Sequence, residues 1–273
     1  MTSIQRTYYE NDALSVVQPE IPLAPGAISI VSKTDTPCYA SIFRVYQNFK
    51  QLGAACYYLE RQDGTRQIIP YPHKGIWSYA RQLLVTWNLL VPRLAWISKR
   101  ALGNELEAAL GRDPVEGVSM HVSAPSCPFC KHEQIATQQV LEEADVRLLY
   151  NFKPVSSKDF LIVAKDHVRD FNEPLFVQML SLAKRVTDAY QAKGYKISYV
   201  SFADAPTSGR TLEHLLVHVS IAKDWKEEVV GIMTVVRKIV LDSWAQFLAP
   251  NLFRLSNADL KIKIDEARLV LGT

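Results

Sequence analysis

The chain has 273 residues, of which 48% are hydrophobic and 22% are charged, the balance of a folded globular protein with room for two domains. Its net charge of +3 gives no electrostatic reason to expect a nucleic-acid or membrane partner. No signal-peptide pattern opens the sequence, and charged, polar and proline residues interrupt the apolar runs near 83–97 too often for a bilayer span.

An internal repeat organises the chain. Residues 8–35, YYENDALSVVQPEIPLAPGAISIVSKTD, align without a gap with residues 140–167, VLEEADVRLLYNFKPVSSKDFLIVAKDH. Each copy has an apolar strand, a turn with proline and a second strand. The predicted strands are Leu14–Val17 and Ala27–Val31 in the first copy, and Arg147–Tyr150 and Phe160–Ala164 in the second. The pattern predicts a duplicated unit with an antiparallel hairpin or meander in each copy, the alternative being a chance similarity of two hairpins.

A helix and two further strands follow in each copy. Apolar residues at helical spacing predict helices over Tyr39–Gly53 and Glu173–Gly194, each ending at a glycine. The strands after them are ACYYLE and RQIIPYP in the first copy, and KISYVSFA and HLLVHVSI in the second. A helix that covers one face of an antiparallel sheet gives an α+β fold class.

The remaining segments are predicted to be helical. We expect two helices between the copies, separated near Pro92, and a long amphipathic helix that ends before Pro250. The glycine- and proline-containing stretch GRDPVEGV marks a domain boundary. The expected segments are a first unit over 1–73, a helical linker over 74–118, a second unit over 119–225 and a C-terminal helical extension over 226–273.

The stretch SCPFCKH is the first that can carry chemistry. Cys127 and Cys130 are spaced so that one turn can bring both sulfurs to one cation, or to each other as a redox dithiol. Four cysteines make no disulfide framework, so we expect a reducing compartment, the cytoplasm. A metal site needs two more ligands, and the candidates are His132, His167, His214 and His218.

Two of these histidines belong to one apolar stretch, EHLLVHV. Its β-branched residues favour a strand, in which His214 and His218 would be roughly 13 Å apart, too far to bind the same ion. A helix would bring both to one metal, but the stretch lacks the glutamate of HExxH proteases. The strand is the preferred interpretation, and one of the two histidines is then free to join the cysteines.

Three stretches over residues 124–222 resemble the histidine triad (HIT) superfamily. In chain order they read CPFC, NFKPVSSKDFLIVAKDHVRDF and SGRTLEHLLVHV. Its signature strand reads His-φ-His-φ-His-φ-φ after a Gly-x-Ser/Thr loop. Residues 4–72 resemble a second, degraded unit, with RQIIPYP where the triad strand should be. Two units in one chain are similar to the galactose-1-phosphate uridylyltransferase and dinucleotide phosphorylase branch. YYLERQDGTRQIIPYP also faintly resembles the C-terminal region of Cwf19-like RNA-processing proteins.

The resemblance implies a structural zinc ion in the second unit. In zinc-bearing members the ligands are the CxxC pair, the histidine after the preceding strand and the first triad histidine. The matching residues are Cys127, Cys130, His167 and His214. A shell of two cysteines and two histidines is complete, so such an ion would stabilise the unit rather than act on a substrate.

The resemblance also places Leu216 where the family has its nucleophilic histidine. Leucine has no lone pair and can be neither nucleophile nor general base. Ala203 stands where the family commonly has an asparagine beside the phosphate. The residues that the resemblance implies for nucleotide or phosphate binding are Asn151, Gly209, Arg210, Thr211 and His218.

Three functions stay open at this point. The first is a non-catalytic pseudoenzyme that binds a nucleotide, a phosphate-containing small molecule or a protein partner. The second is a nucleotide hydrolase or nucleotidyltransferase with a rearranged mechanism, in which His218 acts as the base. The third is an RNA-processing scaffold, which the weak net charge does not support. We expect no membrane partner. The two units are expected to form a pseudo-dimer within one chain, and a further homodimer is possible.

Overall fold

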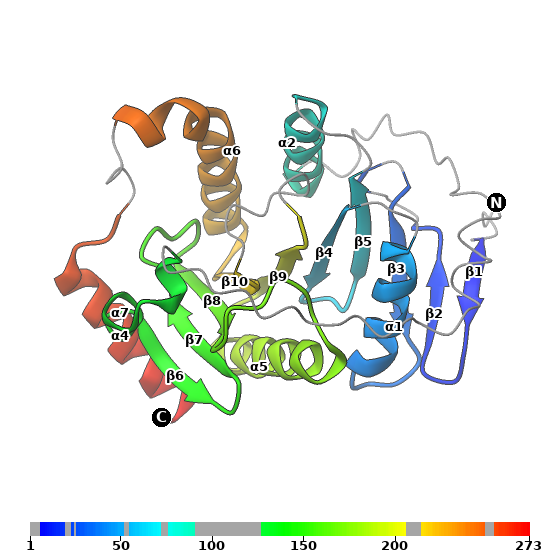
Figure 1. Ribbon diagram of the computed structural model, residues 1–273, viewed down its shortest axis with the longest axis horizontal. Coiled ribbons are helices and arrows are strands. Elements are labelled where there is room, and N and C mark those ends of the chain that lie inside the picture. The colour runs from blue at the N-terminus through cyan, green and yellow to red at the C-terminus, as the bar shows by residue number, and fades with distance from the viewer. Residues whose placement is uncertain are drawn as a thin grey trace. The chain divides into compact units, whose positions relative to one another are not determined.

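A computed structural model of the chain (Figure 1) describes residues 6–19, 23–24, 26–51, 55–71, 76–90, 127–205, 214–248 and 254–273. The chain divides into two compact units. Unit 1 takes its residues from 1–118, 172–177 and 201–211, and unit 2 from 119–171, 178–200 and 212–273. Both units combine antiparallel strands with helices, which confirms the α+β class.

Unit 1 contains an antiparallel sheet with the strand order β1-β2-β3-β5-β4. Its elements are β1 (Thr7–Glu10), β2 (Leu14–Val17), β3 (Ile28–Ser32), α1 (Tyr39–Lys50), β4 (Ala55–Arg61), β5 (Arg66–Tyr71) and α2 (Ile76–Leu90). Apolar residues spaced three or four apart give α1 one buried face. Tyr46 on that face has its ring 5.8 Å from Phe176 and 5.4 Å from Phe202, so aromatic packing fills this part of the core.

Unit 2 repeats the arrangement with the strand order β6-β7-β8-β10-β9. Its elements are η1 (Pro128–Cys130), α4 (His132–Ala136), β6 (Gln139–Glu143), β7 (Val146–Tyr150), β8 (Lys158–Ala164), α5 (Glu173–Ala192), β9 (Ile197–Ala203), β10 (Leu216–Ala222), α6 (Trp225–Leu248) and α7 (Asn257–Leu271). The division between the units passes through α5 and β9. In each copy three strands, a helix and two strands follow one another. The repeat predicts all of these elements except the first strand of each copy, β1 and β6.

The structure agrees with the expected helices of the two copies and with β10 as a strand. The expected C-terminal helix is α6, and α7 is a further helix of the C-terminal extension. The first linker helix is α2, whereas the second expected one, beyond Pro92, lies outside the described residues. The proposed segment boundaries stay a prediction. Among the described helices, none has the length and apolar character needed to cross a bilayer.

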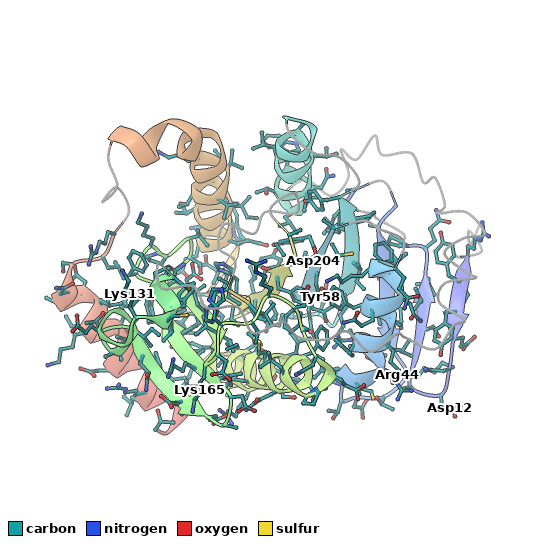
Figure 2. The ribbon with its side chains drawn as sticks, in the orientation of Figure 1. Asp12, Arg44, Tyr58, Lys131, Lys165 and Asp204 are labelled. Carbon is teal, nitrogen blue, oxygen red and sulfur yellow. The ribbon has the colours of Figure 1, made fainter. Side chains whose placement is uncertain are left out.

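The end of β9 is anchored inside unit 1 by a buried carboxylate. Asp204, labelled in Figure 2, follows β9 and is 7% exposed. One of its oxygens accepts the Cys56 backbone N–H at 2.7 Å, and the other accepts the Tyr46 hydroxyl at 3.3 Å. These bonds tie the end of β9 to β4 and to α1. They therefore position the start of the segment that leads towards β10.

Helix α6 approaches the turn after β7 through a glycine. A β-carbon at Gly231 would lie 3.0 Å from the carbonyl oxygen of Val155. Helix propensity alone favours alanine over glycine by about 1 kcal/mol. Because backbone has to move to relieve the contact, we expect Gly231→Ala to lower the free energy of unfolding by about 1 kcal/mol. Urea denaturation would measure it, and a gain in stability equal to the propensity difference would contradict the contact.

Candidate metal centre and ligand face

The two cysteines are brought together by a single tight turn. Cys127 precedes the short helix η1 and Cys130 ends it, and the Cys130 N–H donates to the Cys127 carbonyl at 3.2 Å. Proline at the first helical position suits this turn because its missing N–H has no partner there in any case. Cys127 is buried and Cys130 is exposed. The turn therefore presents one inner and one outer sulfur.

The two histidines meet because β8 and β10 are antiparallel neighbours. Leu216, the first residue of β10, pairs with Val163, close to the end of β8. The segment just before β10 therefore lies beside the segment just after β8, and these segments carry His214 and His167. The Leu215 N–H donates to the Val168 carbonyl at 3.0 Å and holds the two segments together.

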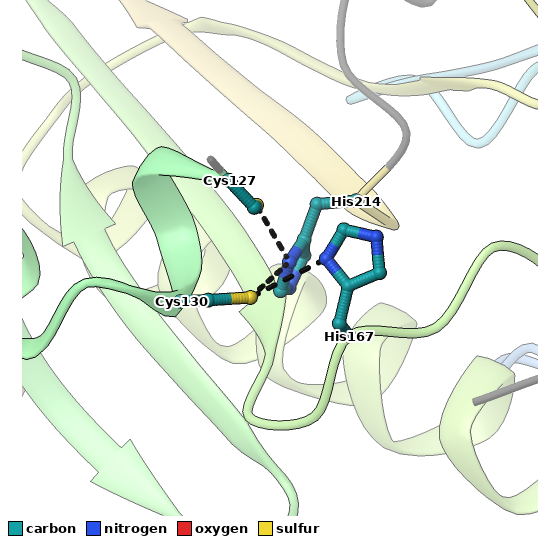
Figure 3. A group of neighbouring side chains, drawn as sticks. All are labelled: Cys127, Cys130, His167 and His214. Carbon is teal, nitrogen blue, oxygen red and sulfur yellow. Dashed lines mark hydrogen bonds between the residues drawn. The ribbon is translucent and has the colours of Figure 1, made fainter. Parts of the chain in front are cut away.

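Figure 3 shows the resulting cluster of Cys127, Cys130, His167 and His214, whose ligand atoms all lie within 4.8 Å of one another. His214 Nδ1 is 3.4 Å from Cys127 Sγ and 3.7 Å from Cys130 Sγ. His167 Nδ1 is 3.3 Å from Cys130 Sγ. In a zinc tetrahedron with Zn–S of about 2.3 Å and Zn–N of about 2.0 Å, sulfur and nitrogen ligands are about 3.5 Å apart. The donor set and its spacing fit the metal that the resemblance implies.

The inner histidine is prepared to bind a metal through Nδ1. His214 Nε2 lies 2.8 Å from the Ala164 carbonyl oxygen, which makes Nε2 the donor and leaves the lone pair of Nδ1 directed at the sulfurs. Burial lowers the pKa of His214 below its ordinary value, the nearby His167 and Arg147 add to this, and the Ala164 hydrogen bond opposes it. His214 is therefore neutral at pH 7, the form that binds metals.

The outer pair is held less firmly. His167 is half-buried, and its Nε2 has no hydrogen-bond partner among the residues that the structure describes. Partial burial of its sulfur and the neighbouring Cys127 raise the pKa of Cys130 to about 11, while Arg147 acts in the opposite direction. Without a cation the Cys130 sulfur is thus a neutral thiol at pH 7. A bound metal ion would supply the positive charge that keeps it a thiolate.

Of the other two histidine candidates, the structure describes the side chain of His218 alone, and it is not part of this cluster. His218 lies further along β10, opposite Leu161 of β8, so the two histidines of the EHLLVHV stretch face different surroundings, as the strand interpretation predicts. His132 begins α4, but its side chain is outside the described part of the chain.

Leu216 separates the cluster from His218 and belongs to an apolar group. Along β10 the residues Leu216, His218 and Ser220 are half-buried and alternate with fully buried neighbours, so they share one face of the strand. Leu216 packs against the buried cluster Cys127, Phe129, Ile135, Leu149, Leu161 and Val163. Among the described residues, the place between the two histidines is therefore occupied by an apolar side chain, that of Leu216, which cannot accept a proton.

A buried carboxylate organises the polar end of this face. Asp159 of β8 is fully buried and is paired with Ser220 in the sheet. It accepts the Val155 N–H at 2.7 Å and the Asn151 side-chain amide at 3.2 Å. Asn151 in turn accepts the Lys153 N–H at 3.0 Å. Asp159 therefore shapes the turn after β7. A charged residue within an apolar strand is the sequence signal that could have pointed to it.

Asn151 is the one implied ligand-binding residue, besides His218, that the structure describes. Both ends of its amide are already hydrogen-bonded within the turn, so a role in ligand binding stays a prediction. Gly209, Arg210 and Thr211 lie outside the described residues. Ala203 is the last residue of β9.

The matching face of unit 1 is closed by its own chain. Ser29 of β3 pairs with Gln67 of β5, as Leu161 of β8 pairs with His218 of β10. The Leu23 N–H donates to Gln67 Oε1 at 3.2 Å, and Asn88 of α2 donates to the Leu23 carbonyl at 2.9 Å. Gln67 and Asn88 are both buried, so the first copy offers no open face at this position.

Comparison with known proteins supports the fold. No protein-family model matches the sequence, and no curated protein matches it either. A solved structure of a uridylyltransferase is similar, with 12% identity, a TM-score of 0.53 and coverage of 96% of this chain and 86% of that one.

Two further solved structures are similar at lower scores. One is a zinc-bound histidine triad family protein from Mycobacterium smegmatis, with 18% identity, a TM-score of 0.33 and coverage of 43% of this chain and 96% of that one. The other is an ADP-glucose phosphorylase from Arabidopsis thaliana with bound ADP-glucose, with 9% identity, a TM-score of 0.46 and coverage of 81% and 82%. Taken with the duplicated strand order, the similarity to the uridylyltransferase shows that the chain has the fold of two tandem HIT-like units.

Proposed function

We propose that Cys127, Cys130, His167 and His214 bind one structural zinc ion. Two thiolates and two imidazoles are the ligands that zinc prefers in closed tetrahedral sites, and their present spacing suits such a shell. With four protein ligands the ion has no open position for water or substrate. Its role is to hold the η1 turn against the segments that flank β8 and β10.

The second part of the proposal is that the chain binds a nucleotide or another phosphate-containing small molecule without cleaving it through a nucleotidyl–histidine intermediate. The observation that carries this is Leu216, which lies between His214 and His218 and packs into an apolar cluster. A nucleophile needs a lone pair at the reacting atom, and this position has none. Binding would fall to His218 with Asn151, Gly209, Arg210 and Thr211.

Isothermal titration of the full chain with AMP and with ADP-glucose tests this proposal. We expect saturable binding that His218→Ala weakens, together with no release of nucleoside monophosphate over hours. Absence of heat with both ligands would contradict the binding claim. Release of nucleoside monophosphate that His218→Ala abolishes would replace it with the second candidate, a hydrolase in which His218 acts as general base.

Restoring the missing histidine gives a sharper prediction. We expect Leu216→His to cost about 1–3 kcal/mol of stability, because a polar ring enters an apolar cluster. If the rest of the ligand face is competent, the variant gains a covalent nucleotide adduct on exposure to ADP-glucose, seen as a mass increase of the intact protein. Leu216→Gln is the matched control, since it brings polarity without a nucleophilic nitrogen. A folded Leu216→His variant that forms no adduct would show that more than the nucleophile has been lost.

A further inference from the structure

We propose that the Cys/His cluster is a peroxide-sensitive redox switch, in which oxidation at Cys130 forms a Cys127–Cys130 disulfide and releases the metal ion. This inference rests on the proposed zinc site and concerns its regulation.

The four ligands fall into a firm pair and a loose pair. Cys127 is 7% exposed and His214 is fully buried, with its ring held by the Ala164 carbonyl. Cys130 is exposed, and the half-buried His167 has no partner at Nε2 among the described residues. A hydrogen bond to the second ring nitrogen of a metal-binding histidine normally strengthens its binding to the metal, so His167 would be the weaker histidine ligand. A reagent from solvent thus meets Cys130 first.

The chemistry balances with a peroxide as the only added reactant. The Cys130 thiolate attacks one oxygen of hydrogen peroxide, the O–O bond breaks, and the products are a sulfenic acid and hydroxide. The Cys127 thiolate then attacks the Cys130 sulfur, the S–O bond breaks, and a second hydroxide leaves as the disulfide forms. Both sulfurs contact the same His214 nitrogen, at 3.4 and 3.7 Å, so the second thiolate is close at hand. Two ligands are consumed, and two histidines alone cannot retain the ion.

Metal release also affects the face of β10 that carries Leu216, His218 and Ser220. The segment that carries both cysteines also supplies Phe129 and Ile135 to the apolar cluster around Leu216. The ion therefore holds η1 and α4 against the part of β10 that separates His214 from His218. Once the ion has left, the described residues of η1 and α4 keep these apolar contacts and short-range hydrogen bonds. We expect η1 and α4 to separate from β10 more often in the oxidised protein.

The experiment uses the zinc-loaded full chain and a chromogenic zinc chelator. Addition of hydrogen peroxide is expected to release one zinc ion per chain while the titratable thiols fall from four to two, with recovery on reduction and re-addition of zinc. Peptide mapping should find the Cys127–Cys130 disulfide, and a brief exposure with dimedone should label Cys130 rather than Cys127. Hydrogen exchange of 127–136 should then increase.

Two variants complete the test. Cys38→Ser removes a thiol of unit 1 that lies outside the cluster, and it should release zinc as the parent does. Cys130→His keeps a zinc ligand but removes one thiolate, and it should hold its zinc in peroxide. Zinc that stays bound while peroxide oxidises other thiols, or first labelling at Cys127, would contradict the redox switch but not the proposed zinc site. A chain that takes up no zinc at all overturns both.

Discussion

Replacing Cys127 with serine is expected to remove the bound zinc and to lower the free energy of unfolding of the zinc-loaded chain by more than about 4 kcal/mol. Cys127 is buried, and its sulfur lies 3.4 Å from His214 Nδ1 in the proposed zinc shell. A serine hydroxyl does not replace a thiolate on zinc, and the three remaining ligands do not close the shell. Metal binding contributes folding free energy, because the unfolded chain has no such site.

Denaturant unfolding in buffered zinc, with metal content measured on the same samples, checks this expectation. Cys38→Ser is the matched control, since Cys38 lies in unit 1, outside the cluster, and it should change stability by less than about 1 kcal/mol. A chelator should bring the parent protein down to the stability of Cys127→Ser. Equal zinc content and equal unfolding midpoints in the parent and Cys127→Ser would show that the cluster is not a metal site.

Truncating Glu60 is expected to cost about 3–5 kcal/mol, the second large effect. Glu60 and Arg66 form a buried ion pair in unit 1, with Arg66 Nη2 2.8 Å from Glu60 Oε1. Tyr58 donates its hydroxyl to Glu60 Oε2 at 3.0 Å. Glu60→Ala would leave a buried guanidinium without its counter-ion and a buried hydroxyl without its acceptor. Urea unfolding, followed by circular dichroism, measures the loss.

The exposed pair Glu10–Lys33 in the same sheet is the matched control. Its atoms are 2.7 Å apart, but both side chains are open to water, so Glu10→Ala should cost less than about 1 kcal/mol. The double variant Glu60→Leu, Arg66→Met should recover much of the loss, because apolar groups of similar size remove the unpaired charge. If Glu60→Ala costs no more than Glu10→Ala, the buried pair does not stabilise unit 1.

The repeat and the CxxC spacing carry most of what could be predicted from the sequence. The aligned copies predict that both units have the same strand order, which the structure shows. Once β8 and β10 are antiparallel neighbours, His167 and His214 have to lie close together. The meeting of the four ligands is thus a consequence of local spacing and of one strand pairing.

Other elements gave weaker signals. The strands β1 and β6 are short, and each contains an irregular step in its pairing, which breaks the alternation by which strands are recognised. Ser256 accepts the Asp259 N–H and caps the start of α7, a helix that the prediction of a helical extension over 226–273 does not separate from α6. A charged residue in an apolar strand points to Asp159, but no residue pattern specifies its partner, the Val155 N–H of the preceding turn.

Phosphorus NMR of ADP-glucose mixed with the zinc-loaded full chain tests whether the protein binds a nucleotide sugar without cleaving it, because one sample reports both binding and cleavage. We expect diphosphate resonances that broaden or shift in proportion to protein concentration, and a spectrum that gains no phosphomonoester signal over a day. A growing phosphomonoester signal would contradict the claim that the chain binds its ligand without cleaving it. Resonances that the protein leaves unchanged would contradict the ligand-binding function.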